Sequence, residues 1–152
     1  GGAMIQASLS TPFGDLIVTE EDGAITALGW GQAARQDRSD LLDAALRQIN
    51  EYATGERQRF DLPLRVKGSD FQRTVCAAIL AIPFGDTRTY GEIARDLGVP
   101  AQPVGGACGG NPIPIIIPCH RVLGAAGLGG FSGGVGVEVK VALLRIENGL
   151  LI

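Results

Sequence analysis

The sequence has few of the residues that build disulfide frameworks and metal sites. Its 152 residues include three cysteines and one histidine, and no Cys-x-x-Cys pair occurs. An odd number of cysteines without regular spacing argues against a secreted disulfide scaffold, and one histidine excludes the common zinc motifs. We therefore expect a cytoplasmic protein that keeps its cysteines reduced and uses neither a metal nor another cofactor.

Long hydrophobic runs are also missing. Although 45% of the residues are apolar, no run reaches the ~18 residues that a membrane-spanning helix needs, so we expect no contact with a membrane. No charged and then apolar leader opens the sequence, and Gly1–Gly2–Ala3 before Met4 is typical of an expression scar. We expect the native sequence to start at Met4.

Positive charge is scarce for a protein that would bind a polyanion, since the formal net charge is −3. Residues 1–70 carry 7 Lys/Arg and 11 Asp/Glu, whereas residues 71–152 carry 6 and 5. A polyanionic partner would therefore meet the second half of the chain, and electrostatic attraction would not dominate its affinity.

The first part of the chain has the pattern of a small α/β unit. Alternating apolar residues in the first thirty positions predict antiparallel strands joined by tight turns. Ser39 or Asp40 can then cap a helix, because apolar residues recur at helical spacing over residues 41–49. We expect an N-terminal subdomain over residues 4–67.

The second part, residues 68–152, is predicted to be mainly helical. Ser69 with Gln72 three residues later is a capping box, and Pro83 ends the helix that it opens. Two further short helices, over residues 90–97 and 101–109, are joined by a glycine-containing turn and have the shape of a helix-turn-helix.

The chain after the helix-turn-helix is expected to carry the chemistry. The apolar, proline-bracketed residues 113–118 predict a short buried strand, and residues 124–136 form a glycine-rich loop. Val139, Leu143 and Ile146 then predict the inward face of a closing helix.

The segment Pro118–Cys119–His120–Arg121 is the strongest candidate for a reactive site. The only histidine lies beside a cysteine, and an adjacent base or cation lowers a thiol's pKa from about 8.5. Neighbours in an extended strand point to opposite faces, so pairing of the two requires a bend after Pro118 or a bridging water. Glu147, at the end of the last helix, is the best-placed acceptor for the second ring nitrogen.

The alternative is a buried cysteine beside a satisfied core histidine, the usual state of both residue types. Cys76 and Cys108 fit that interpretation, because they lie on an apolar helix face and among small residues. For Cys119 it is less attractive, since His120 and Arg121 follow directly. We therefore interpret Cys119 as the reactive thiol.

These motifs closely resemble those of the O6-alkylguanine-DNA alkyltransferases, the methylated-DNA–protein-cysteine methyltransferases. The resemblance rests on Pro118–Val122 with Gly109–Pro114 before it, and it extends over about residues 69–152. It includes further motifs at Phe71–Gln72, Ile82–Gly85, Thr89–Ala94 and Gly129–Phe131. Residues 4–66 are compatible with the family's variable N-terminal subdomain.

The resemblance implies an α+β fold, in which a ribonuclease H-like α/β subdomain with antiparallel strands precedes a mainly helical, winged-helix-like subdomain carrying the helix-turn-helix. It implies DNA repair by direct reversal. The alkyl group of O6-alkylguanine in double-stranded DNA, with O4-alkylthymine a further possible substrate, would pass irreversibly to Cys119, once per molecule. The protein would need no cofactor and no protein partner and would act as a monomer.

Roles for the reacting residues follow from the same resemblance. His120 would act as a base through a water molecule, oriented by Glu147. Asn111 would support the geometry before the thiol with a hydrogen-bond network. Tyr90 would help to rotate the target nucleotide and could donate a proton to the departing guanine, since the base must leave the stack to reach the sulfur.

Other residues would contact DNA or the extruded base. Phe131 and Ser132 would line its pocket, and Gly105 suits a helix pressed close to the DNA backbone. Gln72 and Arg121 are further candidates, although an ion pair within the protein is an equal alternative for Arg121.

The sequence departs from the family at Gln102, where members usually carry an arginine that replaces the extruded base. Glutamine can hydrogen-bond the orphaned cytosine, but it lacks the charge and the stacking plane of a guanidinium. We expect weaker DNA binding with a shallower salt dependence.

Three other functions compete with this interpretation. An alkyltransferase-like protein would bind alkylguanine without efficient repair, and Gln102 favours that alternative whereas Cys119 argues against it. A helix-turn-helix regulator with a sensing thiol would need an effector surface. A cysteine hydrolase fits poorly with adjacent cysteine and histidine and with no identified oxyanion site.

Overall fold

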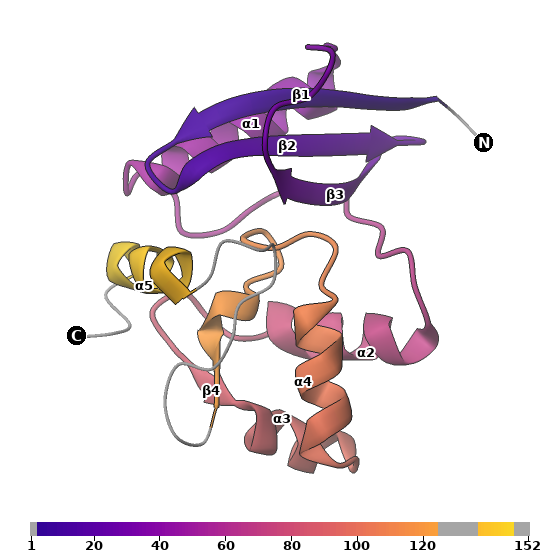
Figure 1. Cartoon of the computed structure of the whole chain (residues 1–152), viewed down its shortest axis with the longest axis vertical. Helices are drawn as coiled ribbons and strands as arrows, with labels where there is room; N and C mark the ends of the chain where they lie inside the picture. The colour runs from indigo at the N-terminus through magenta and orange to yellow at the C-terminus, as the bar shows by residue number, and fades with distance from the viewer. Residues whose placement is uncertain (1–2, 125–136, 148–152) are drawn as a thin grey trace. The chain divides into compact units, whose positions relative to one another are not determined.

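The computed structural model describes residues 3–124 and 137–147 of the chain (Figure 1). By its internal contacts the chain divides into two units, Gly1–Lys67 and Gly68–Ile152. The mixed α and β composition confirms the predicted fold class. Within the described residues, none of the helices is both long enough and apolar enough to cross a membrane.

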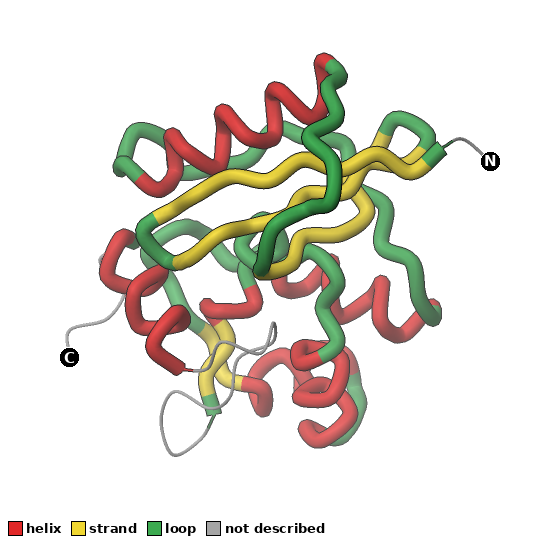
Figure 2. Tube along the Cα trace, turned by 45° about the horizontal axis from the view of Figure 1, so that its top comes forward, coloured by secondary structure: helices red, strands yellow, loops and turns green. Residues whose placement is uncertain are grey.

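The first unit is a three-stranded antiparallel sheet with one helix packed along it (Figure 2). Its elements are β1 (Met4–Thr11), β2 (Gly14–Glu21), β3 (Ala24–Trp30) and α1 (Asp40–Ala53). Asp22 and Gly23 both have positive φ, as a two-residue hairpin turn requires. Ser39, rather than Asp40, caps α1 by accepting a hydrogen bond from the Leu42 backbone N–H at 2.9 Å.

The second unit is mainly helical and contains the predicted helix-turn-helix. Its elements are α2 (Asp70–Leu80), β4 (Arg88–Thr89), α3 (Tyr90–Leu97), α4 (Ala101–Gly109), the 3₁₀ turn η1 (Cys119–Arg121), β5 (Val122–Leu123) and α5 (Val137–Ile146). Gly98 ends α3 in the left-handed conformation that glycine tolerates, and β4 pairs with β5 in parallel.

The capping box predicted for α2 is only half formed. Ser69 accepts from the Gln72 backbone N–H at 3.0 Å, but the Gln72 side chain does not return to Ser69. Its Nε2 donates to the Ala107 carbonyl oxygen in the last turn of α4, at 2.8 Å. Because the last carbonyls of a helix lack partners within the helix, this bond caps α4 from a neighbouring helix.

The strand predicted over residues 113–118 is wrong. This segment is buried as a tight turn, in which the Ile117 N–H donates to the Ile113 carbonyl oxygen at 2.9 Å. Ile115 has φ of +72°, which a β-branched residue rarely adopts. Pro114 and Pro118 have no N–H for a strand ladder, so the apolar run is buried without becoming a strand.

The closing helix α5 is present as predicted, but of the three residues that predicted it only Leu143 is fully buried. Val139 and Ile146 are only partly buried. The buried face consists of Lys140, Leu143, Leu144 and Glu147, all at most 2% exposed. These residues recur at helical spacing and so lie on one face. Two of them, Lys140 and Glu147, are ionisable, and both are buried.

Candidate active site

Cys119 begins the single turn η1, directly after Pro118. Its N–H donates to the Ile117 carbonyl oxygen at 2.8 Å, and the Arg121 N–H donates to the Pro118 carbonyl oxygen at 2.9 Å. The chain therefore bends where the sequence required a bend, so Cys119 and His120 do not alternate across a strand. Cys119 is 5% exposed.

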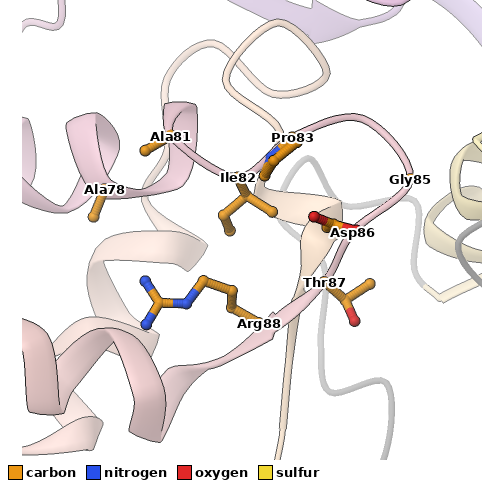
Figure 3. Close-up of a pocket in the computed structure, with 8 residues that line it drawn as sticks. All are labelled: Ala78, Ala81, Ile82, Pro83, Gly85, Asp86, Thr87 and Arg88. Carbon is orange, nitrogen blue, oxygen red and sulfur yellow. The ribbon is translucent and has the colours of Figure 1, made fainter.

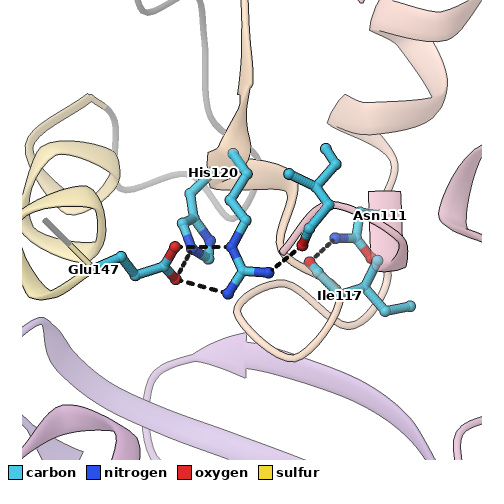
Figure 4. A network of polar contacts seen from close by, with 6 residues as sticks. Asn111, Ile117, His120 and Glu147 are labelled. Atoms are coloured by element: carbon cyan, nitrogen blue, oxygen red, sulfur yellow. Dashed lines mark hydrogen bonds and ion pairs between the residues drawn. The ribbon is translucent and has the colours of Figure 1, made fainter. Parts of the chain in front are cut away.

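Asn111 joins the end of α4 to the segment before the cysteine. Its Nδ2 donates to the Ile117 carbonyl oxygen at 2.9 Å, and its Oδ1 accepts from the Ile113 N–H at 3.0 Å (Figure 4). Its own N–H donates to the Cys108 carbonyl oxygen at 3.2 Å. Since Ile117 also accepts from Cys119, one side chain supports both the turn over 113–117 and the start of η1.

Glu147 joins His120 and Arg121 in one network of hydrogen bonds (Figure 4). The His120 Nε2 lies 2.6 Å from Glu147 Oε2. Arg121 donates to both carboxylate oxygens, from Nε to Oε1 at 2.8 Å and from Nη2 to Oε2 at 3.0 Å. His120 is fully buried, and Glu147 is 2% exposed.

Burial lowers the pKa of His120, although the contact with Glu147 acts in the opposite direction. We infer that the imidazole is neutral and that its Nε2–H donates to Glu147, so the contact is a hydrogen bond more than an ion pair. The tautomer leaves a lone pair on Nδ1, which has no hydrogen-bond partner among the described residues. A buried imidazole nitrogen without a partner is a base that can accept a proton.

Lys140 is a buried charged residue that sequence reasoning missed. Its Nζ donates to the Val122 carbonyl oxygen at 2.7 Å, and burial lowers its pKa while the nearby thiols Cys119 and Cys108 raise it. The signal was present, because Lys140 lies seven residues before Glu147 and so shares its helical face.

The other two thiols are inert at neutral pH. Burial raises the pKa of Cys76, and it raises the pKa of Cys108 to about 12. None of the three cysteines, all of which lie in the described ranges, forms a disulfide. The interpretation of Cys76 and Cys108 as buried cysteines is confirmed.

The helix-turn-helix carries the other described candidates. Tyr90 is the first residue of α3, and burial raises its pKa, so its hydroxyl stays protonated at neutral pH. Gln102 is exposed in the first turn of α4, which has no acidic residue in that turn and no basic residue in its last. At Gly105 an added Cβ would have no neighbour within 4 Å.

Two predicted DNA-contact residues instead have partners within the protein. The Gln72 amide is engaged with α4, as described above, and lies 3.5 Å from the Cys76 sulfur. Arg121 is 7% exposed and forms the ion pair that was the alternative to a phosphate contact. Phe131 and Ser132 lie outside the described residues. The described part of the chain holds no group of three or more His, Cys, Asp or Glu residues suited to a metal.

A pocket of about 400 Å³ opens at the turn between α2 and β4 (Figure 3). Its polar lining consists of Asp86, Thr87 and Arg88, and Arg88 is engaged with Asp96 at 2.6 Å. None of the lining residues is a cysteine or histidine. The pocket therefore lacks the thiol and the imidazole that lie together at the turn containing Cys119.

A buried thiol followed by a histidine, on the same unit as a helix-turn-helix, is the pattern expected of a DNA-binding protein with nucleophilic chemistry. Family models match both units of the chain. The ribonuclease-like domain of 6-O-methylguanine DNA methyltransferase matches residues 4–66, and the DNA-binding domain of the same family matches residues 70–149. The chain belongs to the 6-O-methylguanine DNA methyltransferase family.

Comparisons with individual relatives and solved structures agree with this family assignment. A Mycobacterium tuberculosis methylated-DNA–protein-cysteine methyltransferase is 52% identical over 107 residues, which are 68% of this chain and 64% of that protein's length. The crystal structure of M. tuberculosis O6-methylguanine methyltransferase has a TM-score of 0.84 at 37% identity and covers 99% of this chain and 96% of that one. M. tuberculosis OGT in complex with DNA has a TM-score of 0.84 at 40% identity, covering 94% and 92%.

Proposed function

We propose that this protein is a methylated-DNA–protein-cysteine methyltransferase, which moves an alkyl group from O6-alkylguanine in double-stranded DNA to its own Cys119. The observation that carries the proposal is the arrangement of His120. Its Nε2 is fixed to Glu147, and its Nδ1 is a buried acceptor without a described partner. Cys119 precedes it on the same turn. Family membership and the relatives' names support this assignment.

The reaction is a displacement at the alkyl carbon. The Cys119 thiol passes its proton, through a water, to His120 Nδ1, and the sulfur lone pair forms the new S–C bond. The bond between that carbon and guanine O6 breaks, and its electron pair stays with the base. The base takes up one proton, for which the protonated Tyr90 hydroxyl is the donor, and ordinary guanine results.

The damaged base must leave the duplex before this step. An in-line approach of a buried sulfur to a stacked base is sterically impossible, so the nucleotide is rotated out of the helix. In our proposal α4 contacts the DNA, Gln102 hydrogen-bonds the orphaned cytosine, and Phe131 and Ser132 line the pocket of the extruded base. O4-alkylthymine presents the same alkyl carbon on an exocyclic oxygen and is a further substrate.

Each molecule reacts once. The product is a thioether, whose carbon–sulfur bond resists displacement because a thiolate is a poor leaving group. Transfer should therefore stop at one alkyl group per protein molecule, with no cofactor and no protein partner required.

Transfer of a radiolabelled methyl group from an O6-methylguanine duplex to the protein tests the proposal. Wild type should take up one equivalent, and Cys119→Ser should take up none. Cys108→Ser is the matched control, since that thiol is equally buried, and it should retain one equivalent. Labelling of Cys119→Ser at the wild-type level would disprove the assignment. Tight binding of the duplex by unlabelled wild type would instead support the lesion-binding alternative that Gln102 favours.

A further inference from the structure

Arg121 is bound to two other segments of the second unit, the residue after α5 and the turn after α2. It lies on η1, and its guanidinium holds Glu147 after α5 with two hydrogen bonds. Its Nη1 donates to the carbonyl oxygen of Ile82, just after α2, at 2.6 Å. The ring of Phe84 lies 5.8 Å from Arg121 Cζ. All three donor nitrogens are thus used inside the protein, where the guanidinium fork fits a carboxylate better than a lysine could.

Within the hydrogen-bonded group of His120, Glu147 and Arg121 the charges balance only when Arg121 is present; Lys140 lies outside this group, bonded to the Val122 carbonyl oxygen. Glu147 contributes one negative charge, Arg121 one positive charge, and His120 is neutral. A buried group of net charge −1 would remain without the guanidinium, and burial favours uptake of a proton by such a group. A proton taken up by the imidazole would lie on Nδ1, because Nε2 already carries the hydrogen that Glu147 accepts.

We propose that Arg121 is a positioning residue whose charge keeps His120 Nδ1 available as a proton acceptor at the pH at which the protein works. The inference rests on the proposed alkyl transfer and assigns Arg121 to the proton relay instead of to DNA phosphate. It adds a fourth member to the chain that runs from Cys119 through His120 to Glu147.

Three charged groups act on His120: Arg121, Lys140 and Glu147. Lys140 on α5 and Arg121 itself both lower the pKa of His120, whereas Glu147 raises it. Lys140 is held by the Val122 carbonyl oxygen and stays in place in every variant considered below. Removing Arg121 therefore leaves Glu147 as the nearest charge and raises the proton affinity of the His120–Glu147 pair.

The experiment uses four variants of the full chain. Arg121→Gln removes the positive charge. Arg121→Lys keeps the charge but lacks the planar guanidinium with its paired N–H donors. The double variant Arg121→Gln/Glu147→Gln removes both the guanidinium and the carboxylate charge, so that residues 120, 121 and 147 again carry no net charge. Arg57→Gln breaks an exposed ion pair with Glu51 in the first unit and is the control. Two quantities are measured: the pH dependence of the alkyl-transfer rate, and the imidazole NMR signals without DNA, which report one residue because the chain has one histidine.

In Arg121→Gln the pH below which the alkyl-transfer rate declines should increase by about one unit or more. At a pH below that point the rate should be about tenfold lower than in wild type, and it should recover as the pH rises. The His120 signals should titrate at correspondingly higher pH. The double variant should return both toward the wild-type position, Arg121→Lys should leave the pH of the rate decline within about half a unit, and Arg57→Gln should match wild type.

A purely structural role gives a different result. Arg121→Gln would then lower the rate by one factor at every pH and leave the His120 titration unchanged, which would overturn the proposal. If Arg121→Gln does not fold, Arg121→Lys decides, because a rate decline displaced by a full pH unit despite the retained charge would also overturn it. If wild type transfers no alkyl group, the proposed function fails, while the NMR titration still tests the effect of Arg121 on His120.

Discussion

Asn111→Ala should destabilise the second unit and slow alkyl transfer. The substitution removes both side-chain hydrogen bonds of Asn111 and leaves the Ile117 carbonyl oxygen and the Ile113 N–H without these partners. Asn111 is 6% exposed, and both partners are buried, so water does not readily replace the amide. An unsatisfied buried polar group costs about 1–3 kcal/mol. The Ile117 carbonyl oxygen still accepts from the Cys119 N–H, so the Ile113 N–H is the group left unsatisfied, and with the lost bond to Ile117 we expect a loss of about 2 kcal/mol.

Urea unfolding followed by far-ultraviolet circular dichroism measures this free energy, with the alkyl-transfer rate determined at a temperature where the variant is folded. Asn50→Ala is the matched control, because Asn50 is exposed on α1 and its loss should change stability by less than about 0.5 kcal/mol. An equally small change for Asn111→Ala, with an unaltered transfer rate, would refute the reasoning that this side chain supports the turn before Cys119.

Three further predictions concern the relay, the recognition helix and its cap. Because burial lowers the pKa of His120 below its ordinary 6.5, the unfolded state binds more protons there, so the stability that the neutral imidazole contributes above pH 6.5 should be lost as the pH falls. Unfolding free energies measured from pH 7.5 to 5.5 should decline more steeply for wild type than for His120→Gln. Gln102→Arg should tighten DNA binding and steepen the plot of log affinity against log salt concentration by about 0.9, one phosphate contact. Gln72→Leu, which uncaps Ala107, should lower the unfolding free energy by about 1 kcal/mol, and Gln72→Glu by more, because a carboxylate would face a carbonyl oxygen; thermal denaturation checks both.

The predictable part of the fold is the part that local signals determine. Ser39 and Gly98 mark a helix start and a helix end through their own side chain or backbone freedom, and the structure confirms both. The strands of the first unit follow from alternation and from the Asp22–Gly23 turn. Such features depend on residues a few positions apart, so the sequence contains the information directly.

The segment over residues 113–118 shows where local patterns are insufficient. Its apolar residues predict burial, and burial is confirmed. Strand formation, however, needs successive N–H groups facing a partner, and prolines remove these donors. No local pattern predicts the positive φ of Ile115, because it occurs inside a turn whose flanking residues Ile113 and Ile117 are bonded to Asn111.

The candidate site could be predicted only where its members are adjacent or belong to a motif. Cys119, His120 and Glu147 were found, but Arg121 was left with two roles, since its ion-pair partner lies 26 residues away. Lys140 was overlooked because a lysine on a helix is usually exposed. Its burial depends on which stripe of α5 faces the interior, and the apolar residues Val139 and Ile146 favoured the neighbouring stripe.

The burial of charge in this unit also determines how the protein must bind DNA. Residues 71–152 contain six cations, of which Arg121 and Lys140 are buried and Arg73 and Arg88 are held in exposed ion pairs. Only Arg95 and Arg145 have no ion pair in the described part of the chain. Two phosphate contacts would give a salt slope of about −1.8, and opening both exposed pairs would raise it to only about −3.6. Counterion release is therefore a small part of the expected affinity, and in the proposed mechanism contacts of α4 and the capture of the extruded base would supply the rest.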